Sequence, residues 1–183
     1  TLGVFILWLG WFGFNGGSQL ALGSGADATA IADIFINTNL AAAGGVVAVM
    51  IVSKLTNSHT NVAASLNGAI AGLVAITAEP LTPSMGHAIV IGGIGGVICM
   101  YGMKLLDMLK IDDVVGAIPA HLFAGIWGTL IVPWTNPDTS FGVQFLGVIS
   151  YAAFTLIVSF AVWFAIKAVI GIRASAEDEE YGL

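Results

Sequence analysis

Charged side chains are scarce in this 183-residue sequence, since only 9% of residues are Asp, Glu, Lys or Arg while 57% are hydrophobic. With a mean hydropathy of +0.96, these proportions exclude an ordinary water-soluble domain. The single cysteine, Cys99, cannot form an intrachain disulfide, so no disulfide-stabilised secreted fold is expected. The N-terminus also lacks the basic flank and small-residue cleavage site of a signal peptide. These absences predict an integral membrane protein.

Six apolar stretches are long enough to cross a hydrocarbon core, which takes roughly 20 residues of helix. They predict an all-α polytopic membrane fold, because the alternating pattern of a membrane barrel is not visible. Turn-forming and charged residues separate the stretches. The expected spans are about 2–20, 29–54, 62–78, 85–107, 114–132 and 141–171, and a short tail, 172–183, follows them.

The five basic residues all fall on one side of this layout, and basic residues mark the cytoplasmic side. They are Lys54, Lys104, Lys110, Lys167 and Arg173. Both ends of the sequence are therefore expected to face the cytoplasm. The carboxylates Asp27, Asp33, Glu79 and Asp138 lie toward the opposite side. They could form an acidic vestibule that concentrates a cation, although charge alone favours ordinary solvated loop residues.

Small and polar residues inside the spans predict how the helices pack. Three pairs of small residues four positions apart allow close helix approach: Ala41 and Gly45, Gly68 and Gly72, and Gly92 and Gly96. Asn37, Thr38, Asn39 and Asn67 are expected to form hydrogen bonds between helices. Asp112 and Asp113 stand where carboxylates can accept bonds from the free N–H groups at the start of the fifth span.

One face of the first span carries an unusual series of side chains. Within Gly10–Ser18, which reads GWFGFNGGS, helical spacing aligns Trp11, Phe14 and Ser18 with Leu7. The Ser18 hydroxyl could accept from a small cation, which aromatic faces could hold by about 0.5–2 kcal/mol each. The apolar remainder of the face suits a neutral molecule better than a bare ion. Alternatively, the aromatics form an interfacial belt and Ser18 caps the helix.

His121 lies about seven residues into the fifth span, roughly 10 Å along a helix at 1.5 Å per residue. Ionisable residues at such positions are rare and often mark a pathway or a proton relay. A neutral imidazole can hydrogen-bond a small polar solute or pass a proton. A structural histidine bonded to a neighbouring helix is the alternative. His59 falls in a cytoplasmic loop and His87 near the outer start of the fourth span, so both are expected at the surface.

Five motifs occur in the order typical of one family. They are GWFGFNGGS, NTNLAAAGG, SLNGAIAGLVAITAEPLTPS, KIDDVVGAIPAHLFAGIWGTL and GIRASAEDEEYGL. Together they resemble the C-terminal half of the ammonium transporter (Amt/Rhesus) family, of the bacterial Amt type. The resemblance implies the sixth to eleventh helices of an eleven-helix fold with inverted repeats, which assembles as a homotrimer with a pore in each protomer. It also implies ammonium or ammonia as substrate, a multi-pass place in the inner membrane, and a role in nitrogen uptake.

The resemblance implies roles for individual residues. Ser18 and Trp11 would belong to an outer ammonium-binding site, and Phe14 would be part of a gate. Leu7, Ala117 and His121 would line the pore, with His121 as the second of two pore histidines. The chain departs from many members by having Gly116 in place of an aspartate and Leu122 in place of a glycine, and both departures put the local pore width in doubt.

The same resemblance implies partners that this sequence lacks. The first pore histidine and the first gate phenylalanine come from an N-terminal half, so this sequence is expected to be part of a longer product and to conduct nothing alone. The acidic tail resembles the start of a region that docks a PII-type regulatory protein. An ammonium sensor with a cytoplasmic signalling domain is the alternative function. Catalytic motifs such as GxSxG and HExxH are missing, so no enzyme is expected, nor a cofactor, a metal or a nucleic-acid partner.

Overall fold

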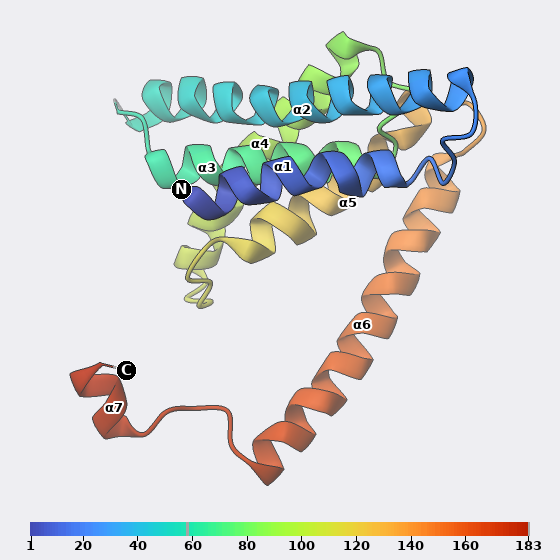
Figure 1. The fold of residues 1–183 in the computed structure, drawn as a ribbon. Helices are drawn as coiled ribbons and strands as arrows, with labels where there is room; N and C mark the ends of the chain where they lie inside the picture. Colours follow the sequence, from blue (N-terminus) through green and yellow to red (C-terminus); the bar gives the residue numbers. More distant parts are fainter. Residues whose placement is uncertain (58, 183) are drawn as a thin grey trace. The chain divides into compact units, whose positions relative to one another are not determined.

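The computed structural model describes residues 1–57 and 59–182, and these residues form helices and connecting loops with no β-strand among them (Figure 1). The all-α class expected from the sequence is confirmed. The helices are α1 (Leu2–Gly17), α2 (Gly25–Asn57), α3 (Val62–Thr77), α4 (Met85–Met108), η1 (Ile118–Phe123), α5 (Ala124–Ile131), η2 (Val132–Trp134), α6 (Phe141–Val169) and α7 (Ala176–Tyr181). The chain divides into two compact units, Thr1–Phe145 and the part from Leu146 onward.

Three of these helices, α2, α4 and α6, are long and apolar enough to cross a membrane. Three shorter apolar segments accompany them: Leu2–Gly17, Val62–Thr77 and Ile118–Trp134. Two predicted bounds differ clearly, because α2 starts four residues earlier than expected and the fifth helical segment starts at Ile118 instead of 114. The tail contains the short helix α7, which the sequence analysis did not anticipate.

The core of the first unit is a seam where α2 and α4 meet backbone to backbone. The pair Ala41 and Gly45 on α2 faces the pair Gly92 and Gly96 on α4. A Cβ atom added at Gly96 would stand 2.7 Å from the backbone oxygen of Gly45, which is closer than a carbon can approach. Glycine is therefore required there by sterics, as the small-residue spacing predicted.

The same α2 pair also faces the small-residue pair of α3, with the order of the contacts reversed. Ala41 contacts Gly72, while Gly45 contacts Gly68. The order reverses because α3 runs antiparallel to α2, as Figure 1 also shows. One pair of small residues thus holds two neighbouring helices close, which explains why α2, α3 and α4 form a tight bundle.

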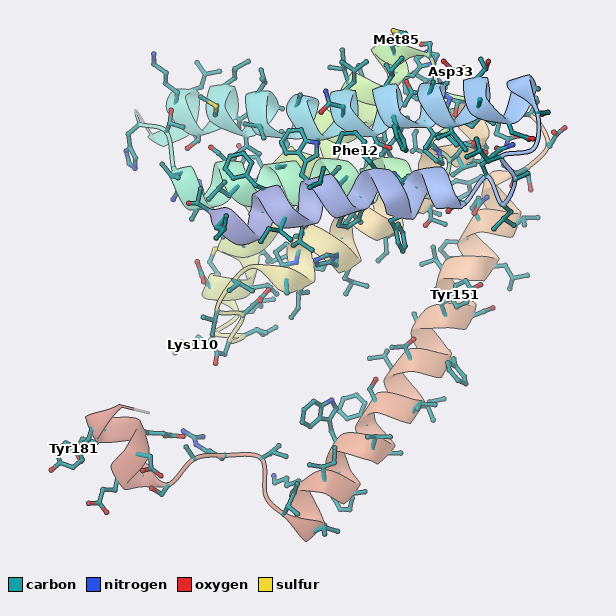
Figure 2. The ribbon with its side chains drawn as sticks, in the orientation of Figure 1. Phe12, Asp33, Met85, Lys110, Tyr151 and Tyr181 are labelled. Atoms are coloured by element: carbon teal, nitrogen blue, oxygen red, sulfur yellow. The ribbon has the colours of Figure 1, made fainter. Side chains whose placement is uncertain are left out.

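These directions place the lysines of the first unit at one end of the bundle. Since α2 and α4 run the same way, Lys54 lies at the same end as Lys104 and Lys110. Figure 2 labels Lys110 beyond one end of α4 and Met85 at the other. Asp27 and Asp33 on the first turns of α2 lie toward the opposite end. The structure supports the shared end of the three lysines, while carboxylates lie at both ends, and the face of the membrane that each end meets stays a prediction.

Polar side chains inside the bundle join separate segments, although Asn37 bonds to the loop between α3 and α4 and not to a helix as expected. Asn37 donates to the backbone oxygens of Pro80 and Pro83 at 3.0 and 2.8 Å. Thr38 accepts a bond of 2.9 Å from Asn15. Asn67 donates to the backbone oxygen of Val115 at 2.9 Å. Asn39 was expected to bond likewise, but it lies on the exposed side of α2 and makes no such bond to the described residues.

The helix α6 and the tail that follows it have features of their own. None of the described residues of α6 is buried, and apolar side chains surround the helix, as expected for a segment that faces lipid or another protein. In the tail, Ser175 caps α7 by accepting from the N–H of Asp178 at 3.1 Å. Arg173 binds Glu179 through two hydrogen bonds of 2.6 and 2.8 Å.

Candidate functional site

One face of α1 presents the aromatic series that the sequence singled out. Leu7, Trp11 and Phe14 are separated by four and three residues, so they share a helical face. Leu7 is 50% exposed and Phe14 is 64% exposed, whereas Trp11 is half-buried. The face is therefore open along an apolar surface and anchored to the bundle at Trp11.

Trp11 is the centre of a ring cluster that joins α1 to η1. Its ring stacks on the imidazole of His121, with centroids 6.5 Å apart and planes inclined by 19°. It meets Phe14 edge-on, with centroids 5.9 Å apart. Its indole Nε1–H donates to the Thr77 hydroxyl at 2.8 Å. The structure thus brings together three of the six predicted site residues, which lie on two segments more than 100 positions apart.

The segment that carries His121 begins with an irregular turn. Gly116 has a φ of +73°, a left-handed conformation that favours glycine. Asp113 then accepts hydrogen bonds of 2.8 Å from the N–H groups of Ala117 and Ile118, as expected for a carboxylate before a helix. Because of this turn, the helical segment starts only at Ile118, and His121 is the fourth residue of that segment. The sequence analysis had placed His121 about seven residues from the start, which was wrong.

The turn that contains His121 is wider than an α-helical turn. Residues Ile118–Phe123 form a π-helix, a form that occurs mostly as single turns and frequently at functional sites. Pro119 stands near its start, where a missing N–H costs least. The N–H of Ala124 donates to the oxygens of His121 and Pro119, which closes the wide turn. The local sequence thereby places an exposed imidazole against Trp11.

Ser18 ends α1, and its hydroxyl donates to the backbone oxygen of Phe14 at 3.1 Å. This bond matches the capping role that the sequence left open as an alternative. The hydroxyl oxygen retains lone pairs, so it can still accept from a cation. Ser18 is therefore tied to the ring cluster through the backbone of Phe14. Leu7 stands one helical turn before Trp11, and Ala117 lies just before η1.

Acidic residues at the end of the bundle near Ser18 accept hydrogen bonds from loop residues. Asp27 accepts from Gln19 at 3.3 Å and from the Ser24 hydroxyl at 2.7 Å. Glu79 accepts from Asn136 at 2.7 Å, which ties the turn after α3 to the loop before α6. These bonds agree with loop carboxylates better than with a vestibule built for a cation. The described residues contain no group of three His, Cys, Asp or Glu that could hold a metal.

Sequence reasoning missed Thr77 and Asn15, which both hold the aromatic face in place. Thr77 lies 66 positions from Trp11, so no local pattern could pair them. Asn15 is buried and donates to Thr38 on α2. An amide directly after Phe14 in a helix that is otherwise apolar was the available signal for a bond between helices.

Similarity to known proteins extends over the whole chain. The chain matches the model of the Ammonium Transporter Family over residues 1–183. It is 41% identical to the ammonium transporter Amt2 of Archaeoglobus fulgidus, in an alignment that covers 100% of this chain and 42% of that protein. The chain spans less than half the length of this curated relative.

Two solved structures are similar in fold as well as in sequence. A structure titled Sensor Amt Protein superimposes with a TM-score of 0.91 at 34% identity, covering 100% of this chain and 47% of that one. The structure of Mep2 from Candida albicans gives a TM-score of 0.85 at 26% identity, covering 97% and 43% of the two chains. The whole chain therefore has counterparts of the same fold.

Proposed function

Because this chain belongs to the ammonium transporter family, we propose that it lines the path by which ammonium or ammonia crosses a membrane. Its relatives are more than twice as long, so the complete path requires an N-terminal half that supplies the opposite wall. This chain alone would conduct nothing. The proposal assigns it the second half of the wall, with the face of α1 and the start of η1 turned toward the solute.

Entry begins with a cation at the exposed end of α1. The Ser18 oxygen accepts a hydrogen bond from NH4⁺, and the faces of Trp11 and Phe14 attract its charge by about 0.5–2 kcal/mol each. These contacts replace part of the hydration shell that the ion loses. Beyond Phe14 the wall offers apolar groups and rings, where a charged solute is costly.

The ion therefore transfers its proton to water on the outer side of Phe14, forming hydronium there, and neutral ammonia continues past Trp11 and His121. A neutral imidazole accepts or donates one hydrogen bond, which suits a solute that can do both. Leu7 and Ala117 add apolar wall on either side. Potassium has no proton to lose, so it meets the full desolvation cost and is rejected.

The stacking of Trp11 on His121 is the observation that carries this proposal. It places an imidazole and two aromatic rings from α1 and η1 on one exposed surface, with a hydroxyl at the outer end. The imidazole of His121 is exposed beside the Trp11 ring. Such a surface favours passage of a small neutral base.

The test is transport of methylammonium by the full-length protein in proteoliposomes. His121→Ala should lower the initial rate at least about tenfold, because the solute loses its polar partner inside an apolar passage. His59→Ala is the matched control, since His59 is exposed between α2 and α3. Rates and potassium exclusion equal to those of the unmodified protein would refute the role of His121.

Assembly and regulation are part of the same proposal. The protein is a homotrimer in the cell's inner membrane, and both ends of this segment face the cytoplasm, as the positions of the basic residues support. The acidic tail with α7 is the start of a region that a PII-type protein can contact. Native mass spectrometry of the full-length protein would give the trimer mass, and a monomer alone would contradict the assembly.

A sensor function is the second candidate, and the similarity to the structure titled Sensor Amt Protein favours it. In this alternative the same face binds ammonium, and occupancy changes an attached cytoplasmic domain. Binding of ammonium without measurable flux would support the sensor. Flux through the reconstituted protein would support the transporter.

A further inference from the structure

Thr77 makes two hydrogen bonds with one hydroxyl group, and together they fix the direction of each. Its Oγ1 lies 2.7 Å from the backbone oxygen of Leu73, one turn earlier on α3, and 2.8 Å from Nε1 of Trp11. A carbonyl can only accept, so the hydroxyl proton goes to Leu73. An indole N–H can only donate, so the Thr77 oxygen accepts from Trp11.

The bond has two effects on Trp11. It occupies the single hydrogen-bond donor of the side chain, so the ring has no other polar group to offer. It also fixes the plane of the ring, because the indole is held at Nε1 by α3 while its face stacks on His121. The surface that Trp11 presents beside His121 and Phe14 is then its π system.

We propose that Thr77 is a positioning residue for solute passage, which keeps the Trp11 N–H away from the path and so prevents the indole from holding ammonia. This inference rests on the proposed function. The lone pair of ammonia is a good acceptor, and a free indole N–H in an apolar passage would bind it strongly. A passage that conducts must bind its solute weakly enough to release it.

Removing the hydroxyl should therefore change the transport kinetics in a way that a loss of folded protein would not. In Thr77→Val the indole donor is unpaired and can turn toward the solute. The half-saturation concentration and the maximal rate should then both fall, each by about three- to tenfold, as expected for one added hydrogen bond. Loss of folded protein alone would lower the maximal rate and leave the half-saturation concentration unchanged.

The experiment compares three variants of the full-length protein in proteoliposomes with the unmodified form. Thr77→Ser keeps the hydroxyl and should retain normal transport of methylammonium. Thr56→Val is the matched control, because Thr56 donates to the oxygen of Val52 at 2.8 Å in the same way but lies on an exposed turn of α2. The indole N–H of Trp11 is followed by NMR of ¹⁵N-tryptophan-labelled protein and assigned with Trp11→Phe.

The Trp11 N–H resonance should shift in Thr77→Val and stay in place in Thr77→Ser and Thr56→Val. A resonance unchanged in Thr77→Val would overturn the inference, because the bond would then not form. A shifted resonance with an unchanged half-saturation concentration would overturn it as well, since the donor would have no effect on the solute. If the unmodified protein moves no methylammonium, the proposed function fails, and the resonances still show whether Thr77 holds Trp11.

Discussion

The seam of α2 with α3 and α4 and the ring cluster on α1 and η1 use opposite means to bring helices together. At the seam, glycines and alanines let backbones touch, and the contacting residues are buried. At the ring cluster, large side chains reach between helices while Phe14 and Leu7 remain at least half exposed. The seam has no room for another atom, whereas the ring cluster borders open space.

The difference separates stability from function in this half of the fold. Backbone contact leaves no room for a solute, so the seam can only hold the bundle. Exposed rings stabilise little by burial, so their arrangement calls for another explanation, and the proposed path for ammonia provides one. Substitutions in the two regions should therefore have different consequences.

The largest effect is expected at the seam, for Gly96→Val. Its Cβ would stand 2.7 Å from the oxygen and 2.9 Å from the Cα of Gly45, and neither backbone atom can move without separating α2 from α4. We expect a loss of about 3 kcal/mol or more of stability. Thermal unfolding of the full-length protein in detergent would measure it.

Gly10→Val is the control for this substitution, because no atom lies within 4 Å of a Cβ added there. It should unfold at nearly the temperature of the unmodified protein. Equal stability of the two variants would show that the seam can open, and the contrast between the two regions would be lost.

Phe14→Ala should show the opposite pattern, because it should change transport clearly and stability very little. The side chain is 64% exposed and makes one edge contact with Trp11, so the change in unfolding free energy should be below about 1 kcal/mol. Discrimination of methylammonium against potassium should fall up to about tenfold, because less apolar wall then opposes a charged ion beyond position 14. Competitive uptake in proteoliposomes would measure it.

Phe5→Ala is the matched control, because Phe5 is 62% exposed on the same helix and lies outside the ring cluster. It should leave discrimination unchanged. If both variants lose discrimination equally, the effect belongs to α1 in general, and Phe14 has no special role.

An intermediate effect is expected at Asp113, which connects the two regions by starting the His121 segment. Asp113→Ala would leave the N–H groups of Ala117 and Ile118 without their partners and should cost about 1–2 kcal/mol. It should also lower transport, because the imidazole would lose its fixed place against Trp11. Unfolding and flux would be measured on the same preparation.

Asp112→Ala provides the comparison for Asp113, since Asp112 makes no hydrogen bond to the helix start in the part of the chain that the structure describes. The two carboxylates are adjacent, although Asp112 is the more exposed of the two. An effect that depends on charge alone would therefore appear in both variants. Equal losses in the two variants would mean that charge before η1 matters and that the specific bonds do not.

Local patterns predicted the seam well, and they predicted the ring cluster only in part. A spacing of four residues between small side chains is enough to bring helices close, so the pairs at Ala41, Gly68 and Gly92 could be identified from the sequence. The face of Trp11 and Phe14 was equally visible in helical spacing. His121 could be named but not placed, because a glycine with positive φ and a π-helical turn shift the start of its helix.

The partners of the ring cluster were beyond the reach of sequence patterns. The bond of Trp11 to Thr77 joins α1 to the last turn of α3, and its formation depends on how these two helices pack. The roles assigned to Ser18, Leu7 and Ala117 remain predictions, because they depend on a solute and on a facing wall. The spacing of residues was thus enough to predict the fold, whereas predicting the site required knowledge of how the helices pack.

The smallest effect is expected in the tail, at the Arg173–Glu179 pair. The guanidinium of Arg173 lowers the pKa of the Glu179 carboxyl from its ordinary value of 4.5, and Glu179 raises the pKa of Arg173 in turn. A lowered carboxyl pKa stabilises the folded tail above about pH 4.5, and the stabilisation is lost as the pH falls through the lowered value. Both side chains are exposed, so the contribution is slight.

NMR titration of glutamate carboxyls in ¹³C-labelled protein would measure this pair directly. Arg173→Gln should move the Glu179 midpoint back up toward 4.5, and added salt should do the same by screening. Lys167→Gln should leave it in place, because Lys167 belongs to the last turn of α6. If Arg173→Gln does not move the midpoint, the ion pair is not populated, and the Ser175 cap is then the contact that holds α7.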